Sequence, residues 1–201
     1  MRGVVAEMNK DENVRVIDFL PMGKSEVPPH KRKPIAQAVG EKYFSLLEVV
    51  PRKDITFKSG DEIYIGEGVR DKVDHIERRI RYDWLTPTAK TELKIILEEI
   101  IKGDEKRFVD FYNDAGTIST RLHKLECLPR IGRKHRQDIL EERRVRPFDS
   151  FEDMHDRVSN LPDPVKVIAE KIIHELRGED KYNLFVPLIA EKKPHERRSR
   201  F

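Results

Sequence analysis

Cysteine is almost absent from this sequence: Cys127 is the only one among 201 residues. An internal disulfide is therefore excluded, which favours a reducing compartment, and we expect a cytoplasmic protein. Long apolar runs are absent as well, since no stretch approaches the roughly 18 consecutive apolar residues of a membrane-spanning helix. The first fifteen residues also lack the apolar segment of a secretory signal. We expect no association with a membrane.

Motifs for common enzyme chemistry are missing too. The segment Ile65-Gly66-Glu67-Gly68 is too short for a phosphate-binding loop and lacks its lysine. The seven histidines are scattered, and no zinc-ligand spacing or nucleophile elbow appears. We therefore expect no metal, no cofactor and no enzymatic activity, although a nucleic-acid enzyme with an unrecognised site stays open as a minor alternative.

Charge is abundant and unevenly distributed. Charged residues make up 38% of the chain, hydrophobic residues 37%, and the net charge is +3. Residues 117–146 carry nine Lys/Arg and four Asp/Glu, whereas the segments on either side, 83–116 and 147–186, are net acidic. Such a local basic segment is typical of a surface that binds a polyanion. A chance fluctuation in a highly charged surface explains the charge pattern equally well.

The pattern of apolar residues changes near residue 85. Before it, short apolar runs separated by Gly and Pro predict four or five strands, within 14–20, 34–39, 43–50, 61–65 and 73–82. A small sheet of this kind usually closes into a barrel, because closure removes exposed edges. We expect an OB-like barrel over residues 1–84, and an SH3-like barrel fits the strand count nearly as well.

After residue 85 the apolar period becomes helical. Thr86-Pro87 is a typical helix start, and Gly103 is a typical end. Further helices are expected from Asp104, Thr117, Arg133, Ser150 and Val165, the last of them ending at Gly178. The fold class is therefore α+β: the barrel, then an all-α domain over residues 85–188, then a basic, disordered tail over residues 189–201.

The segment Leu128-Pro129-Arg130-Ile131-Gly132 lies between two of the expected helices and resembles the turn of the helix-hairpin-helix motif. In that motif, backbone N–H groups at the start of the second helix bind a phosphate oxygen. Arg130 replaces the first glycine of the motif and Arg136 replaces a small residue, which could deform the turn or add cationic contacts. A plain helical corner with a basic surface is the alternative. The candidate nucleic-acid-binding residues here are Pro129, Arg130, Ile131, Gly132, Arg133, Lys134 and Arg136.

A second helical hairpin is expected around Pro162-Asp163-Pro164. Its turn has no glycine and its surroundings are acidic. We interpret it as the structural partner of the first hairpin, giving tandem helix-hairpin-helix units with one phosphate site.

Three consecutive cations, Lys31, Arg32 and Lys33, lie between prolines in the loop that joins the first two expected strands. In an OB-like barrel this loop borders the ligand face, so we include all three as candidate nucleic-acid-binding residues. A solvated loop is an equally good interpretation. Nearby aromatic residues could stack on bases, but most small barrels use such residues in the core: Tyr43, Phe44, Phe57 and Tyr64.

Several strings across residues 14–186 resemble a family of uncharacterised archaeal proteins that are thought to bind RNA. They include Lys33–Glu41, Leu85–Lys90, Arg121–Glu126 and Pro147–Asp153. The resemblance implies an OB-like domain followed by a helix-hairpin-helix domain, and a nucleic-acid partner, RNA rather than DNA, with possible protein partners in a ribonucleoprotein. The alternatives are a DNA-binding protein and a protein-interaction adaptor that uses the tandem hairpins.

Overall fold

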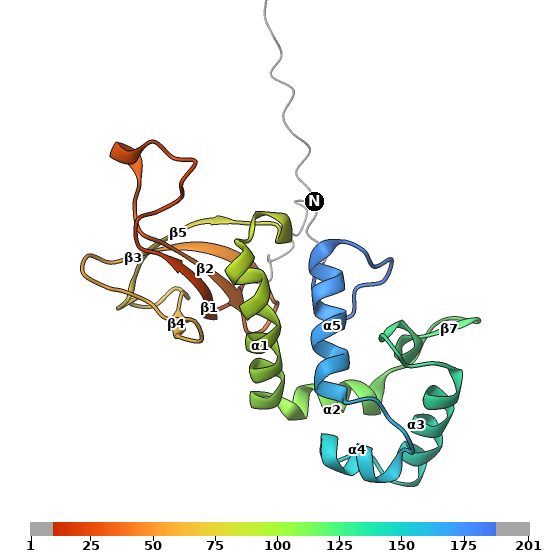
Figure 1. The fold of residues 1–201 in the computed structure, drawn as a ribbon. Helices are drawn as coiled ribbons and strands as arrows, with labels where there is room; N and C mark the ends of the chain where they lie inside the picture. Colours follow the sequence, from red (N-terminus) through yellow and green to blue (C-terminus); the bar gives the residue numbers. More distant parts are fainter. Residues whose placement is uncertain (1–9, 188–201) are drawn as a thin grey trace, which may run out of the picture.

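The computed structural model describes residues 10–187 of the chain. Five antiparallel strands form one sheet in the order β4-β1-β2-β3-β5, which curls into a half-barrel (Figure 1). No ladder joins β4 to β5 among the described residues, so these two strands are the edges of an open sheet. The strands are β1 (Asn13–Leu20), β2 (Ile35–Gly40), β3 (Leu46–Pro51), β4 (Glu62–Tyr64) and β5 (Val73–Arg79).

The central strands β2 and β3 are buried on both faces, which explains their continuous apolar runs. Ala38 and Leu47 belong to a cluster inside the half-barrel, whereas their neighbours Val39 and Leu46 belong to the cluster shared with the helices. Successive strand residues point to opposite faces, so β1, β2 and β3 each supply both clusters. Irregular register between Val16 and Asp18 in β1, and at two places in the β3–β5 pair, increases the local twist and helps the sheet to curl.

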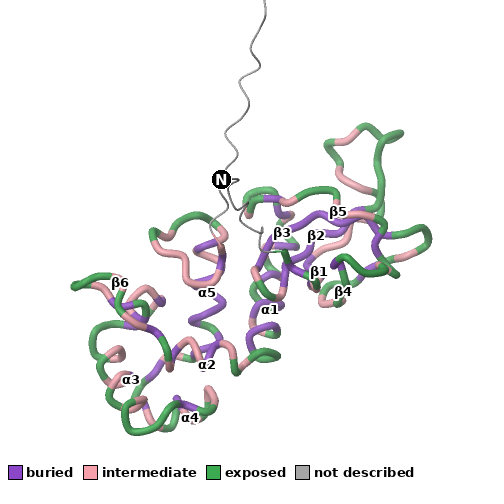
Figure 2. Tube along the Cα trace, turned by 180° about the vertical axis from the view of Figure 1, so that it is seen from behind, coloured by how far each residue is buried: buried purple, intermediate pink, exposed green. Residues whose placement is uncertain are grey.

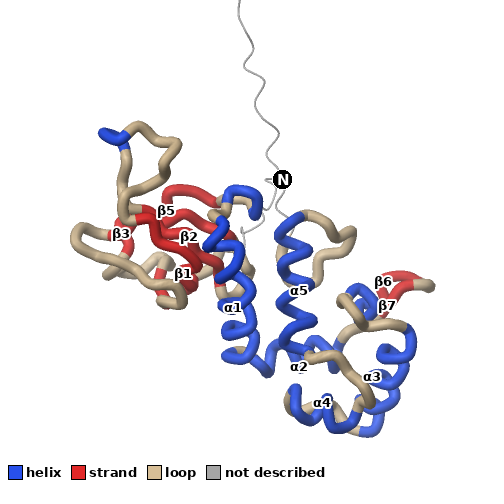
Figure 3. The backbone as a smooth tube through the Cα atoms, viewed as in Figure 1, coloured by secondary structure: helices blue, strands red, loops and turns tan. Residues whose placement is uncertain are grey.

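Within residues 10–187, five α-helices follow the sheet (Figure 3). Thr86 starts the first of them, because its side-chain oxygen accepts a hydrogen bond from the N–H of Ala89 at 3.0 Å. Gly178 ends the last, with the left-handed φ of 73° that glycine adopts freely. The helices are α1 (Pro87–Gly103), α2 (Glu105–Asp114), α3 (Arg133–Val145), α4 (Phe151–Arg157) and α5 (Pro164–Arg177).

Helices α1 and α5 lie side by side and connect the sheet to the smaller helices (Figures 1 and 2). Figure 2 shows buried stretches along β1, β2 and β3 and along both of these helices. The chain after α5 is held by Glu175, whose carboxylate accepts hydrogen bonds from the backbone N–H groups of Leu184, Phe185 and Val186.

The helix expected from Thr117 is wrong. The chain forms a small ribbon there, β6 (Thr117–Ser119) paired with β7 (Leu122–His123), followed by one 3₁₀ turn, η3 (Lys124–Cys127). The β-branched residues Thr117, Ile118 and Thr120 favour strand over helix, and Pro129 limits the length available. The segment before the candidate turn is therefore a ribbon and a 3₁₀ turn instead of an α-helix.

The remaining short elements are η1 (Pro29–Lys31), in the loop between β1 and β2, and η2 (Tyr82–Trp84), between the sheet and α1. The expected basic tail, residues 189–201, lies outside the described residues.

Candidate nucleic-acid interface

Two buried apolar side chains anchor the turn between η3 and α3 in the core. Leu128 is 2% exposed and Ile131 is 5% exposed, and the N–H of Ile131 donates to the carbonyl of Leu128 at 3.3 Å. Ile131 therefore packs into the core, as its place in the motif predicts. Pro129 lies half-buried at the start of the turn.

Arg130 occupies the position of the missing glycine and adopts the backbone conformation that a glycine would. Its φ is 63°, in the left-handed region that L-residues adopt only with strain. Its guanidinium Nη2 donates to Glu170 Oε2 on α5 at 2.8 Å. Arg130 thus has a φ typical of glycine, and its guanidinium is already paired with Glu170.

The N-terminus of α3 is open to solvent. Gly132 is its N-cap residue and supplies no side-chain cap. The backbone N–H groups of Gly132, Arg133 and Lys134 make no hydrogen bond to any described residue, and all three residues are exposed. A Cβ atom added to Gly132 would meet nothing within 4 Å. These outward-facing donors and the helix dipole can therefore hold an anion.

Two cations flank this open end and are free to add charge. Arg133 and Lys134 are exposed, and neither forms an ion pair within residues 10–187. Arg136, expected to join them, is half-buried and its Nη1 lies 3.1 Å from Glu126 Oε2. Glu126 Oε2 also accepts a hydrogen bond from the N–H of His123, so Arg136 fastens η3 to α3. Arg136 is therefore a structural residue in this fold.

The sequence analysis missed two basic residues that lie close to this turn along the chain. Arg121, at the tip of the β6–β7 ribbon, and Lys124, in η3, are exposed and have no ion-pair partner among the described residues. They were missed because a single helix was predicted over residues 117–125, and such a helix has no exposed turn at Arg121. The run Ser119-Thr120-Arg121 was the available turn signal.

The second turn lacks an open N-terminus. The carboxylate of Asp163 accepts hydrogen bonds from the N–H groups of Val165 at 3.0 Å and Lys166 at 3.4 Å, at the start of α5. The place of an external anion is therefore taken by a side chain of the protein itself.

The cationic loop between β1 and β2 lies far from this turn: it projects from the sheet at one end of the molecule, and α3 lies at the other (Figures 1 and 2). Arg32 donates to the carbonyls of Val27 and Ser25 at 2.7 and 2.9 Å, and Lys33 pairs with Glu77 at 2.6 Å. Lys31 is exposed and has no ion-pair partner among the described residues. Of the three expected cations, Lys31 alone makes no side-chain hydrogen bond or ion pair among the described residues.

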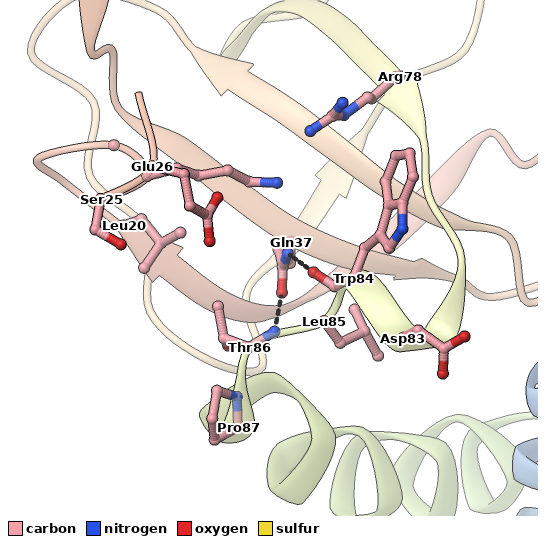
Figure 4. Close-up of a pocket in the computed structure, with 12 residues that line it drawn as sticks. Leu20, Ser25, Glu26, Gln37, Arg78, Asp83, Trp84, Leu85, Thr86 and Pro87 are labelled. Carbon is pink, nitrogen blue, oxygen red and sulfur yellow. Dashed lines mark hydrogen bonds between the residues drawn. The ribbon is translucent and has the colours of Figure 1, made fainter. Parts of the chain in front are cut away.

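A pocket of about 700 Å³ lies between this loop and the start of α1 (Figure 4). Its wall includes Trp84, the only tryptophan of the chain, with 51% of its surface exposed. Gln37 fixes the backbone beside it: its Nε2 donates to the carbonyl of Trp84 at 3.0 Å, and its Oε1 accepts from the N–H of Thr86 at 2.9 Å. The backbone that carries the exposed indole is therefore fixed, and a planar group can stack on the indole ring.

Glu48, fully buried behind this pocket, neutralises the two cations that line it. Its carboxylate bonds to Lys24 and, at 2.8 Å, to Arg78, whose guanidinium lies 4.9 Å from the centre of the Trp84 ring. Burial alone would raise the pKa of Glu48, but the hydrogen bonds from the two cations outweigh it and hold the pKa below its ordinary value. The pocket thus offers an aromatic wall without a free cation.

The aromatic residues near the sheet divide between core and surface. Phe44 and Phe57 are buried, in agreement with the core interpretation, and Tyr43 is half-buried. Tyr64 is 39% exposed. Of the four, Tyr64 is the residue best placed to contact a ligand.

A family model described as "Protein of unknown function (DUF655)" matches residues 10–187. The chain belongs to the DUF655 family. The uncharacterised protein MJ0038 of Methanocaldococcus jannaschii, also similar, is 44% identical over 173 residues, which are 85% of this chain and 77% of that protein. The crystal structure of the DUF655 protein Af1531 from Archaeoglobus fulgidus has a TM-score of 0.83 and 48% identity, and the match covers 88% of this chain and all of Af1531.

The expected membership in an uncharacterised archaeal family is thus confirmed. The DUF655 match spans the half-barrel and all five helices, so the open turn and the pocket beside Trp84 both lie within the matched region. Nucleic-acid binding is not part of the family description and stays a prediction from the site.

Two further observations concern metal ions and membranes. Within residues 10–187, no three His, Cys, Asp or Glu side chains are grouped so that they could hold a metal ion. The helices of this region are also too short or too polar to cross a lipid bilayer.

Proposed function

We propose that this protein binds nucleic acid by holding a backbone phosphate on the open N-terminus of α3. The observation that carries the proposal is the set of exposed, unbonded N–H groups on Gly132, Arg133 and Lys134, with no side chain at Gly132 to obstruct an anion. Phosphate oxygens are the acceptors that such helix starts bind. RNA is favoured over DNA by the resemblance of the sequence to proteins thought to bind RNA.

In this proposal the turn acts as a helix-hairpin-helix unit in which η3 replaces the first α-helix. Arg133 and Lys134 strengthen the contact through charge, and Arg121 and Lys124 extend it along the β6–β7 ribbon. Helices α4 and α5 form the second, structural unit, whose N–H groups are capped by Asp163. Binding of this kind needs only backbone contacts, so it tolerates many sequences.

The half-barrel supplies a second contact region in this proposal. We interpret it as OB-like, because β1, β2 and β3 form an antiparallel meander with β4 added beside β1. Lys31 in the projecting loop is the cation that it offers. A single strand that reaches from the turn to the sheet would contact both regions.

The test is a double charge reversal, Arg133→Glu with Lys134→Glu, measured by fluorescence anisotropy with labelled RNA at several salt concentrations. The wild-type log–log salt slope should be roughly −3 to −4 if about four cations contact phosphates. The variant should bind about 100-fold more weakly, with a slope shallower by about 1.5, because two contacts are lost. Its melting temperature should not fall, since neither side chain has a partner within the described residues and acidic residues are favourable in the first turn of a helix.

The matched control is Lys94→Glu with Lys102→Glu. Both lysines are exposed on α1 and form no ion pair among the described residues, so the change in net charge is the same. The RNA affinity of the control should fall less than about threefold. A flat salt dependence in the wild type, or equal losses in both double variants, would refute the proposal.

A protein-interaction adaptor is the second candidate. Several large apolar side chains are exposed, although they belong to separate parts of the fold: Met22, Val69, Trp84, Ile95 and Val145. Scattered exposure of this kind is normal in soluble domains and marks no single docking face. A partner that stays bound after nuclease treatment of the complex would favour the adaptor.

A further inference from the structure

Strand β5 ends in two consecutive arginines, Arg78 and Arg79, whose guanidinium groups differ in their partners. Successive strand residues point to opposite faces, so Arg78 reaches the pocket beside Trp84 and Arg79 reaches a second pocket. Arg78 is neutralised by the buried carboxylate of Glu48. The only hydrogen bond of Arg79 within the described chain runs from Nη2 to Ser45 Oγ at 2.7 Å, and no described carboxylate lies within 4.0 Å of its guanidinium.

Arg79 has fewer acceptors than two other half-buried arginines of the described chain. Arg107 donates to the carbonyls of Glu41 and Lys42, and Arg143 donates to those of Tyr112 and Ala115. Arg79 has no such set of acceptors, and it lines the pocket. Burial lowers the pKa of this guanidinium, which reflects the cost of a partly desolvated charge. An acceptor group from a ligand would offset that cost.

The pocket that Arg79 lines, which we call the seam pocket, has a volume of about 440 Å³. It lies where the half-barrel stays open, between β3 and β5 on one side and the end of β4 on the other. Its apolar walls suit a flat ring: Leu47, Ile65, Ile76 and Tyr64. Charged side chains also line the pocket, which disfavours a long apolar chain.

Tyr64 is fixed in place at this pocket. Its hydroxyl accepts a hydrogen bond from the N–H of Gly68 at 3.1 Å, and its ring covers Gly66 so closely that a Cβ there would lie 2.4 Å from the hydroxyl oxygen. The aromatic wall is therefore ordered before any ligand arrives.

The charges around the seam pocket disfavour a phosphate as the main group bound. Three cations line it, and three carboxylates balance them: Lys10, Arg70 and Arg79 against Asp11, Glu12 and Glu67. A neutral ring with acceptor atoms avoids repulsion from these carboxylates and still satisfies the guanidinium. Arginine makes its best contact of this kind with two adjacent acceptors.

We propose that the seam pocket binds one unpaired nucleobase, with the Arg79 guanidinium donating to two adjacent acceptor atoms and the ring lying against Tyr64. Guanine presents O6 and N7 in this way, and cytosine presents O2 and N3, whereas adenine and uracil present no pair of adjacent acceptors. This inference rests on the proposed function, and it makes the ligand a single strand with a preference for G or C at one position.

The experiment compares three RNA heptamers, UUUGUUU, UUUAUUU and UUUUUUU. The wild type should bind the G-containing heptamer about tenfold more tightly than the other two. Arg79→Lys keeps the charge but not the paired donors, so the preference should vanish while the affinity for UUUUUUU stays within twofold. Arg81→Gln, in the exposed arginine two residues further along, is the control and should keep the preference.

A direct measurement covers the case in which the Arg79 variants are unstable. In the wild type, the side-chain Nε–Hε resonance of Arg79 should shift on addition of GMP or CMP and not of AMP or UMP. Absence of a shift with GMP and CMP would overturn the inference, as would a G preference that persists in Arg79→Lys.

The charge-reversed turn variant separates this inference from the proposed function. It should weaken all three heptamers by the same factor and keep the preference for G. If it binds like the wild type and the preference persists, the phosphate site is refuted and the seam pocket stands. If it weakens binding but the wild type shows no preference, the seam pocket is refuted and the phosphate site stands. If no heptamer binds to the wild type, both are refuted.

Discussion

Helices α3 and α5 both begin after a turn that contains proline, and they start in opposite ways. At α5 the carboxylate of Asp163 accepts the free N–H groups of the first turn. At α3 the equivalent residue is Gly132, and its neighbouring N–H groups face solvent. Similar local architecture thus gives one closed and one open helix start. The N-cap side chain, and not the turn itself, decides whether an external anion has a place to bind.

The largest expected effect comes from closing the open start with Gly132→Asp. The new carboxylate would accept the N–H groups of the first turn, as Asp163 does, and nothing within 4 Å obstructs its Cβ. We expect RNA affinity to fall about 100-fold, while the free energy of unfolding rises by about 0.5 kcal/mol from capping and the helix dipole. Anisotropy and chemical denaturation measure the two changes.

Gly116→Asp is the control for this substitution, since a Cβ there also meets nothing within 4 Å and the added charge is the same. It should change affinity less than about threefold. A Gly132→Asp variant that binds RNA like the wild type would show that the N–H groups of α3 do not hold the ligand.

The converse change, Asp163→Ala, opens the closed start. It leaves two N–H groups at α5 without their acceptor, so the free energy of unfolding should fall by about 1–2 kcal/mol. RNA affinity should stay within about twofold, because residues 147–186 carry nine acidic against five basic residues and repel phosphate. A marked gain in affinity would show that an open helix start suffices without nearby cations.

The fold was predictable wherever local sequence decides it. Strand runs, the Thr86-Pro87 start of α1 and the Gly178 end of α5 all follow from periodicity and capping. The structure of the segment after Thr117 was not predictable from local sequence, because a two-stranded ribbon depends on pairing between its strands. The spacing of Ile118, Leu122 and Leu125 fits a helix equally well.

The candidate site was predictable in position but not in its available charge. The turn and Gly132 follow from the motif. Which cations are free depends on partners brought close by the fold: Arg130 pairs with a residue 40 positions away, and Arg136 with one 10 positions away. Arg130, at the position of the motif's first glycine, adopts a left-handed φ.

Glu170→Gln tests whether the ion pair with Glu170 keeps Arg130 from contacting RNA at the start of α3. Removing this carboxylate frees Arg130 at the edge of the turn, so RNA affinity at low salt should rise about threefold, and more weakly at high salt. Both side chains are largely exposed, so stability should change by less than about 1 kcal/mol. Glu152→Gln, in an exposed glutamate with no ion pair among the described residues, should leave affinity unchanged. An equal rise in RNA affinity in both variants would show that the effect depends on net charge alone.

The smallest expected effect separates the backbone of Arg130 from its side chain. Arg130→Gly and Arg130→Ala both remove the guanidinium and leave the Glu170 carboxylate unpaired, so both should weaken RNA binding by the same factor, about threefold at low salt. Only glycine relieves the left-handed strain at φ 63°, which costs an L-residue about 1 kcal/mol. The glycine variant should therefore be more stable than the alanine variant by about 0.5–1 kcal/mol in denaturant titrations. This is the reverse of the usual order, in which alanine is the more stabilising residue because glycine is more flexible in the unfolded chain. An alanine variant at least as stable as the glycine variant would mean that residue 130 is not left-handed in solution, and the open start of α3 would then need another explanation.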